Sequence, residues 1–406
     1  MKKDNAMVGR GLRAQVCGLA FSLLAACAAA PPPAVAPVEP ERVRSFDEAA
    51  TRLGANMLSR ALELPAPAGG KPRTVAIDPL IESANGQQTA ATEALHQRIA
   101  GLFANQAAAV SLKPLHESDA ADSGYLLLGT ISNGPASAPE SLRLDLALID
   151  LRLAKVLFHA SELAAAQGVD RTPLPYFRDS PVRVKDPAVD AYVRTASTDA
   201  GLPVDPAYLQ HANAAPVIEE AASLYNTGRY DEALGRYRAA SQLPSGKQLR
   251  VYTGIYLSLL KLGRGSEAEL AFGAVVAAGM RYNELSLKLL FAPGRTDFWA
   301  DPRVSGPYAM WLRQVARQAD AAKTCLLISG HTSATGKSEL NESLSLQRAN
   351  VIKQRLVRES GDLASRIKTV GVGSAQNIVG SGTDDAADAL DRRVEFKVTA
   401  CEAKAV

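Results

Sequence analysis

The stretch GHTSATGKS, residues 330–338, contains the residue types in this 406-residue chain that most clearly suggest chemistry. Its Gly-Lys-Ser end, the apolar run CLLIS before it and the helical pattern after it are typical of a loop that binds nucleotide phosphates. Such a loop has four residues between its first glycine and Gly-Lys-Ser, whereas five lie between Gly330 and Gly336. Backbone N–H groups that converge on a phosphate do not absorb an extra residue freely, so we do not expect an ATP site.

A longer pattern surrounds this stretch. It comprises Gly330-His331-Thr332, Gly336, Asn341, Leu344-Ser345, Arg348-Ala349, Gly371-Val372-Gly373 and Arg392-Arg393-Val394-Glu395. At this joint spacing, residues from about 285 to 400 resemble the OmpA-like C-terminal domain. The resemblance implies a βαβαββ order, in which helices pack on a mixed sheet. The expected elements are the strand LSLKLLF, a helix over 308–321, the strand CLLISGH, a helix from its N-cap Asn341 to about Glu359, and the strands IKTVGVG and RRVEFKV.

The resemblance also implies a ligand. In that family an aspartate of the loop and an arginine of the next helix clamp the diaminopimelate of a peptidoglycan stem peptide: the aspartate takes the ammonium and the guanidinium takes the carboxylate. The arginine position is Arg348, for which a structural ion pair is the alternative. The aspartate position is Ser333, which carries no charge, so we expect binding weaker by about tenfold or more. Glu339 or Glu342 could substitute if the loop folds back. The candidate peptidoglycan-binding residues are Thr332, Ser333, Asn341, Leu344, Arg348 and Arg392.

The four cysteines have different expected fates. Leu24-Ala25-Ala26-Cys27 resembles a bacterial lipobox, which implies a signal peptide over 1–26 and lipid attachment to Cys27; a plain secretory signal is the alternative. Ala28 in place of an aspartate favours the outer membrane. Cys325 and Cys401 then remain in an oxidising compartment. They form a disulfide if their strands are antiparallel neighbours, and otherwise stay unpaired buried thiols.

Three segments follow the signal. The proline-rich residues 27–44 predict an extended tether. Residues 45–166 predict an α+β accessory domain, with a capped helix from Ser45, a strand RTVAIDPLI, a helix ATEALHQRIAGLFANQ and strands GYLLLGTIS, SLRLDLALID and KVLFHA. The alternation of SLRLDLALID suits a half-buried antiparallel strand. Residues 167–212 contain prolines and few periodic signals, which indicates an ordered linker or strap.

An internal repeat lies within residues 213–280. LYNTGRYDEALGRY (224–237) matches LLKLGRGSEAELAF (259–272), with a period of 35 residues between Gly228 and Gly263. The pattern resembles the tetratricopeptide repeat, whose helices form hairpins that bind proteins or act as spacers. We expect the glycine and alanine of each copy to let the paired helices approach closely. Two copies are few for independent stability, so they are expected to lean on neighbouring helices or on the C-terminal domain.

The whole sequence therefore predicts a multidomain α+β protein that ends in an OmpA-like domain over 281–406. A net charge of +3, from 45 basic and 42 acidic residues, gives no strong field for nucleic acid. The histidines do not have the spacing of metal ligands, and no motif of a catalytic serine or cysteine stands out in the sequence. We therefore expect that the protein has no cofactor and is not an enzyme. Two hypotheses follow: an outer-membrane lipoprotein that grips peptidoglycan and contacts an envelope protein through its repeats, or an envelope scaffold whose peptidoglycan binding is weak or lost.

Overall fold

The computed structural model describes residues 42–116, 124–292, 294–378 and 391–401. The expected signal peptide, most of the tether and the lipidation site Cys27 lie outside the described residues. None of the described helices combines the length and the apolar character that a membrane crossing requires.

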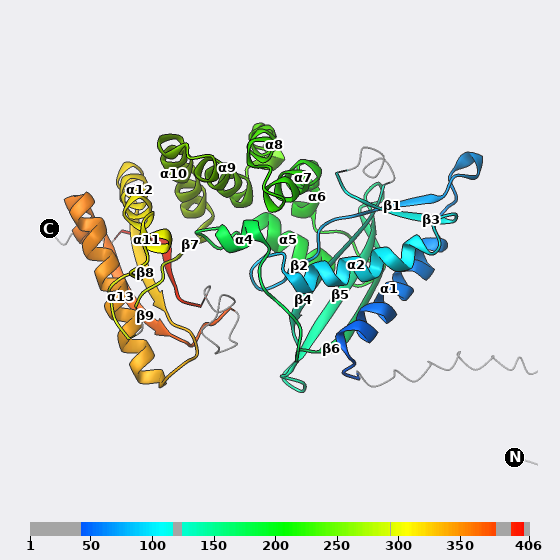
Figure 1. Ribbon diagram of the computed structural model, residues 1–406, viewed down its shortest axis with the longest axis horizontal. Coiled ribbons are helices and arrows are strands. Elements are labelled where there is room, and N and C mark those ends of the chain that lie inside the picture. Colours follow the sequence, from blue (N-terminus) through cyan, green and yellow to red (C-terminus); the bar gives the residue numbers. More distant parts are fainter. Residues whose placement is uncertain (1–41, 117–123, 293, 379–390, 402–406) are drawn as a thin grey trace, which may run out of the picture. The chain divides into compact units, whose positions relative to one another are not determined.

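The N-terminal part is an α+β unit built on a six-stranded sheet with the order β3-β1-β4-β5-β6, in which β2 also pairs with β4 (Figure 1). Strands β1, β3 and β4 run parallel, whereas β5 and β6 are antiparallel to their neighbours. Ser45 caps the first helix by accepting from the Glu48 N–H, as the capping-box spacing predicts. The elements are α1 (Phe46–Leu62), β1 (Arg73–Ile77), β2 (Ile81–Glu82), α2 (Ala90–Ala104), β3 (Val110–Pro114), β4 (Tyr125–Asn133), β5 (Ser141–Asp150) and β6 (Lys155–Ala165).

Strand β5 is antiparallel, as its alternation predicts, but it is buried on both faces rather than half-buried. Leu142, Leu144 and Leu146 enter a core that also contains residues of α1 and α2. Ala147 and Ile149 enter a second core on the other face. The prediction of one solvated face is wrong because the chain after residue 166 folds back and covers that face.

This covering segment lies in residues 167–212, which the sequence analysis expected to be a linker or strap. It contains the helices α4 (Pro175–Asp179), α5 (Pro187–Ala196) and α6 (Pro206–Ala212). Each of the three begins with a proline, the residue best suited to the first helical turn. Helices α5 and α6 supply Val189, Tyr192 and Tyr208 to the second core of the N-terminal sheet.

The internal repeat forms two helical hairpins, α7–α8 and α9–α10. The helices are α7 (Ala215–Asn226), α8 (Tyr230–Gln242), α9 (Leu249–Lys261) and α10 (Gly265–Tyr282). The two copies repeat an ion pair: Arg229 binds Glu232, and Arg264 binds Glu267 at 2.7 Å. Gly228 and Gly263 were expected to let the paired helices approach closely, but this expectation is wrong, because no atom lies within 4 Å of an added Cβ at either position. Both have positive φ and form the turn inside each hairpin.

The C-terminal part has the expected βαβαββ order, with the sheet order β7-β10-β8-β9. Strand β8 is parallel to β9, and β10 is antiparallel to both β7 and β8. Helix α13 packs on β8 and β9, and α12 packs beside α13 (Figure 1). The elements are β7 (Leu285–Lys288), α11 (Pro302–Ser305), α12 (Tyr308–Ala321), β8 (Cys325–His331), α13 (Ser338–Glu359), β9 (Ile367–Gly373) and β10 (Arg393–Thr399).

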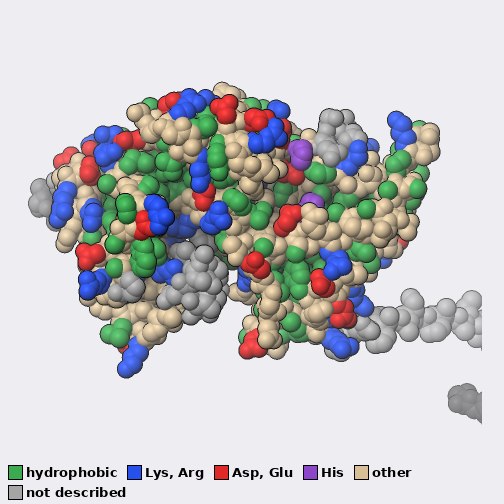
Figure 2. Space-filling view, viewed as in Figure 1, with side chains coloured by type: hydrophobic (Ala, Val, Ile, Leu, Met, Phe, Trp, Pro, Cys, Tyr) green, Lys and Arg blue, Asp and Glu red, His purple; other side chains and the backbone are tan. Residues whose placement is uncertain are grey.

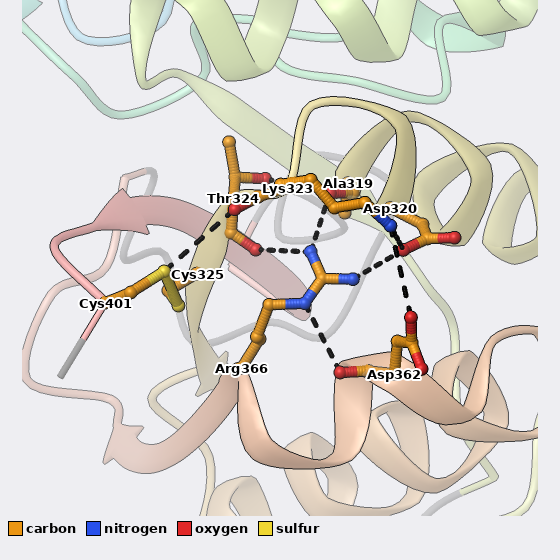
Figure 3. Close-up of polar contacts among 8 residues, drawn as sticks. All are labelled: Ala319, Asp320, Lys323, Thr324, Cys325, Asp362, Arg366 and Cys401. Atoms are coloured by element: carbon orange, nitrogen blue, oxygen red, sulfur yellow. Dashed lines mark hydrogen bonds and ion pairs between the residues drawn. A yellow bond between two sulfur atoms is a disulfide. The ribbon is translucent and has the colours of Figure 1, made fainter. Parts of the chain in front are cut away.

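Two links join neighbouring strands at one end of this sheet (Figure 3). The Arg366 guanidinium donates to the carbonyls of Ala319 and Thr324, both at 3.1 Å, and to the carboxylate of Asp320 at 2.6 Å. These bonds hold the end of α12 and the start of β8 beside the start of β9. Because β10 is antiparallel to β8, Cys401 lies beside Cys325, with the Cα atoms 5.2 Å apart, and the expected disulfide joins them.

The repeat helices and the C-terminal sheet share one hydrophobic core, which runs from Tyr176 to Phe396. At its centre, Trp311 of α12 donates its indole N–H to the Tyr256 hydroxyl of α9 at 2.8 Å and stacks on Phe272 of α10. The hairpins therefore lean on the C-terminal sheet, as their low copy number predicts.

Candidate functional site

The loop from His331 to Lys337 connects β8 to α13 and is held down at both ends. An added Cβ at Gly330 would lie 2.1 Å from the backbone oxygen of Ser345, so only glycine lets α13 approach the strand this closely. The Thr332 N–H donates to the carbonyl of Gly373 at 2.9 Å, and the Gly373 N–H donates to the Ser345 hydroxyl at 3.0 Å. The glycines and the serine of the sequence pattern thus fix where the loop begins.

Ser333 and Asn341 shape the interior of the loop. The Ser333 hydroxyl lies 2.9 Å from that of Thr335, and the Asn341 side-chain amide donates to the Thr335 carbonyl at 2.9 Å. Asn341 was expected to be an N-cap, but this expectation is wrong: Lys337 occupies the N-cap position, and Asn341 lies inside the first turns of α13. Its side chain binds the carbonyl of the preceding loop, a tertiary contact that capping rules do not predict.

Arg348 lies on α13, two turns beyond Asn341, and is 5% exposed. Its guanidinium donates to the carbonyls of Arg295 at 3.1 Å and Ala292 at 3.3 Å, and lies 4.8 Å from the centre of the Phe291 ring. The loop after β7 therefore positions Arg348. Two backbone carbonyls and an aromatic ring thus help to hold the guanidinium in place.

All six candidate binding residues line a single cavity of about 1100 Å³. They come from the β8–α13 loop (Thr332, Ser333), from α13 (Asn341, Leu344, Arg348) and from the residue before β10 (Arg392). The Thr332 hydroxyl is buried at this wall and has no hydrogen-bond partner among the described residues. Glu339 and Glu342 are exposed, and neither is among the described residues that line the cavity.

Comparison with known families identifies the domain that carries this cavity. A model of the OmpA family matches residues 300–390. These residues form an OmpA domain. The match begins just before α11 and includes α12, β8, the loop, α13 and β9.

The relatives match about a fifth of the chain. Outer membrane porin F of Pseudomonas aeruginosa is 37% identical over 81 residues, which are 20% of this chain and 23% of the porin. The probable lipoprotein YiaD of Escherichia coli is 39% identical over 77 residues, 19% of this chain and 34% of the relative. The chain thus covers about a quarter to a third of the length of these two relatives.

Among solved structures, the peptidoglycan-associated lipoprotein of Burkholderia pseudomallei is similar at 23% identity and a TM-score of 0.24. The similarity covers 28% of this chain and 89% of that one. The cell wall anchor of the T6SS from Pseudomonas aeruginosa is similar at 24% identity and a TM-score of 0.24, over 29% of this chain and 80% of that one.

The cavity is not confined to the OmpA domain. Helix α9 contributes Tyr256, Leu257, Leu260 and Lys261, and the chain after α4 contributes Ser180 and Pro181. Trp299 and Tyr308 add aromatic surface. Sequence reasoning missed these residues because they lie outside the loop pattern.

The cavity wall is rich in cations. Figure 2 shows Lys and Arg side chains around and inside a hollow on the face in view. Lys288 of β7 is one of the lining residues, and its ammonium donates to the carbonyls of Phe177 and Arg178, both at 3.1 Å. Burial lowers the pKa of Lys288 to about 8, so this side chain still carries its charge at neutral pH.

Below the loop, the OmpA domain buries a charged cluster. Glu395 of β10 accepts from the Arg393 guanidinium at 2.8 Å, and its second oxygen lies 3.6 Å from His331 Nε2. Neither ring nitrogen of the buried His331 has a hydrogen bond among the described residues. Its ring is therefore held at the start of the loop by burial, beside the carboxylate of Glu395.

Proposed function

We propose that this protein is an outer-membrane lipoprotein that binds peptidoglycan noncovalently through its OmpA domain. Lipid attachment at Cys27 would anchor the chain, and the proline-rich tether would hold the folded part away from the membrane. The OmpA domain would then bind the stem peptide, so that the membrane is tied to the cell wall.

The observation that carries this proposal is the convergence of Thr332, Ser333, Asn341, Leu344, Arg348 and Arg392 on one cavity. Arg348 and Arg392 supply guanidinium groups, which suit the planar carboxylate of a peptide. The carbonyls of Ala292 and Arg295 in the loop after β7 hold the Arg348 guanidinium in place, so the group is preorganised for a ligand.

A second role belongs to the helical hairpins, which we propose contact an envelope protein. Leu260 on α9 is 40% exposed and Leu270 on α10 is 75% exposed. Exposed leucines on helical hairpins offer apolar contacts to a partner. If peptidoglycan binding is weak, this scaffold role is the main function. Ser333 favours that alternative because it lacks the carboxylate of the OmpA pattern.

Sedimentation with purified sacculi tests the proposal. The chain from residue 41 onward, which contains every described element, should pellet with sacculi. Arg348→Ala should weaken retention by about tenfold or more, because it removes a charge-assisted hydrogen bond to the ligand. Arg355→Ala is the matched control: Arg355 also lies on α13 and over an aromatic ring, Phe298, at 4.4 Å, but it does not line the cavity.

Retention of the parent chain and of Arg355→Ala, with loss for Arg348→Ala, supports peptidoglycan binding at this cavity. A parent chain that stays in the supernatant would overturn the proposal in favour of the scaffold role. Circular dichroism of each variant shows whether the fold is kept.

A further inference from the structure

Part of the cavity wall lies outside the residues that match the OmpA family. This second wall contains Asp179 at the end of α4, Leu260 and Lys261 of α9, and Trp299 before α11. The whole cavity, at about 1100 Å³, is larger than an ordinary ligand pocket of roughly 300–1000 Å³. A stem peptide held at the β8–α13 loop therefore does not account for the second wall.

Trp299 gives the second wall an aromatic surface that is in place before a ligand binds. Its side chain is 38% exposed, and its backbone N–H donates to the Leu290 carbonyl at 2.9 Å. The neighbouring rings of Phe291, Phe298 and Tyr308 pack in series, with centroids 5.2 and 5.0 Å apart. The segment that carries Trp299 is thus well held. The face of its indole ring is electron-rich and attracts C–H groups, which carry partial positive charge.

The charged groups of the second wall already contact one another. The Asp179 carboxylate lies 2.8 Å from the Lys261 ammonium and 3.6 Å from the Arg178 guanidinium, and it accepts from the Tyr225 hydroxyl at 2.9 Å. The side chains of Lys261 and Asp179 are still 37% and 20% exposed. A hydroxyl group of a ligand could therefore accept from the ammonium and donate to the carboxylate without separating them.

The other charged side chains that line the cavity before residue 330 also have partners. Arg303 binds Asp301 at 2.6 Å, and the Lys288 ammonium donates to the carbonyls of Phe177 and Arg178. A carboxylate or ammonium of a ligand would have to compete with these contacts. A neutral ligand with hydroxyl groups leaves them in place, so this part of the cavity favours a neutral polar ligand that also has apolar surface.

An N-acetylated hexosamine combines these properties. Its ring has C–H faces, its acetyl group ends in an apolar methyl, its hydroxyls donate and accept, and it has no net charge. The glycan of peptidoglycan consists of such sugars and carries the stem peptides.

We infer that the second wall binds the glycan beside the stem peptide, with an N-acetylhexosamine ring stacked on Trp299. The acetyl methyl packs on Leu260, and sugar hydroxyls bind Asp179 and Lys261. This inference rests on the proposed function and names a further part of its ligand. It also gives α9 of the repeat a role in peptidoglycan binding.

Titration calorimetry with two soluble probes tests the glycan contact. One probe is the stem tetrapeptide that contains diaminopimelate, and the other is the same tetrapeptide on its disaccharide of N-acetylglucosamine and N-acetylmuramic acid. The chain from residue 41 onward should bind the disaccharide probe about tenfold more tightly, as expected for one or two added neutral contacts. Trp299→Ala should remove this difference and leave the affinity for the free tetrapeptide unchanged.

A matched pair of leucines tests the wall from the repeat side. Leu260 and Leu270 are both exposed on the hairpins, but only Leu260 is among the described residues that line the cavity. Leu260→Ala should narrow the difference between the probes by about threefold, because part of an apolar contact is lost. Leu270→Ala should leave it unchanged. Fluorescence of Trp311, the other tryptophan, shows whether Trp299→Ala keeps the fold.

The outcomes separate the glycan contact from peptidoglycan binding itself. Equal affinities of the parent chain for the two probes would overturn the glycan contact while peptidoglycan binding stands. Equal weakening of both probes by Trp299→Ala would mean that Trp299 contacts the peptide instead. If neither Trp299→Ala nor Leu260→Ala affects either probe, the wall serves another occupant, such as an apolar segment of an envelope protein. Retention on sacculi without binding of either probe also contradicts the inference, and loss of all binding contradicts both proposals.

Discussion

At the scale of single residues, the cluster of His331, Arg393 and Glu395 links the loop to acid stability. Burial raises the pKa of Glu395, but the contact with His331 and the charge of Arg393 outweigh it and hold that pKa well below its usual range. Burial lowers the pKa of His331. Because the pKa of Glu395 is lower in the folded than in the unfolded state, its carboxylate stabilises the fold at pH values above the unfolded-state pKa. This stabilisation is lost as the pH falls toward the folded-state pKa. The neutral His331 contributes stability that is lost as pH falls below about 6.5.

Glu395→Gln should destabilise the OmpA domain by about 3–5 kcal/mol, because it leaves the guanidinium of Arg393 buried without its partner charge. Arg393 is 4% exposed. Urea unfolding at neutral pH measures the loss, and the acid limb of the stability curve should also become shallower. Glu267→Gln removes the same charge from the exposed pair with Arg264 and should change stability little. Equal effects of the two substitutions would contradict the role of burial.

At the scale of elements, one glycine decides how closely the two helical hairpins pack. An added Cβ at Gly254 of α9 would lie 2.3 Å from the ring of Tyr237, which is buried on α8. Gly235 of α8 is exposed, and no atom lies within 4 Å of an added Cβ there. The same substitution at these two sites therefore separates packing from helix propensity.

Gly254→Ala should destabilise the protein by about 1–3 kcal/mol, because the tightly packed ring of Tyr237 must move. Gly235→Ala should instead stabilise it by roughly 0.5–1 kcal/mol, since alanine favours the helix over glycine. Denaturant midpoints for both variants measure the difference. A stabilising effect at Gly254 would show that α8 and α9 are not packed this closely.

At the scale of the whole molecule, the shared core makes the OmpA domain depend on the helices before it. Trp311 donates to Tyr256 across this junction. Glu269 of α10 also accepts from the guanidinium of Arg313 on α12, with both bonds at 3.0 Å. Removal of the helices would expose this apolar surface to water.

A fragment of residues 285–406 should therefore unfold at a lower temperature than the chain from residue 41 onward, or aggregate. A fragment of residues 174–406 keeps the helices, so its melting temperature, followed by tryptophan fluorescence, should stay close to that of the longer chain. Both tryptophans, Trp299 and Trp311, lie in both fragments, so the same fluorescence signal reports on each. Equal melting temperatures of the short fragment and the chain from residue 41 onward would show that the shared core adds nothing to the OmpA domain.

The sequence by itself determined the secondary structure of the OmpA domain to within a few residues. The helix over 308–321 and the strands CLLISGH and IKTVGVG have the expected bounds. The resemblance to the OmpA-like domain implied the order of these elements, and local apolar patterns supported their bounds. The sequence left open whether the strands next to Cys325 and Cys401 are antiparallel neighbours, and the structure shows that they are.

The tertiary structure alone decided the contacts that join distant segments. Asn341 binds the loop rather than capping its helix, β5 is covered on both faces, and Gly228 and Gly263 form turns. The sequence located Ser333 as the place where a carboxylate is missing. The charge of the cavity around it, however, comes from residues as far apart as Arg178 and Arg392, which only the folded chain brings to one wall. Spacing along the chain carries no information about such neighbours, because their proximity depends on how whole elements pack.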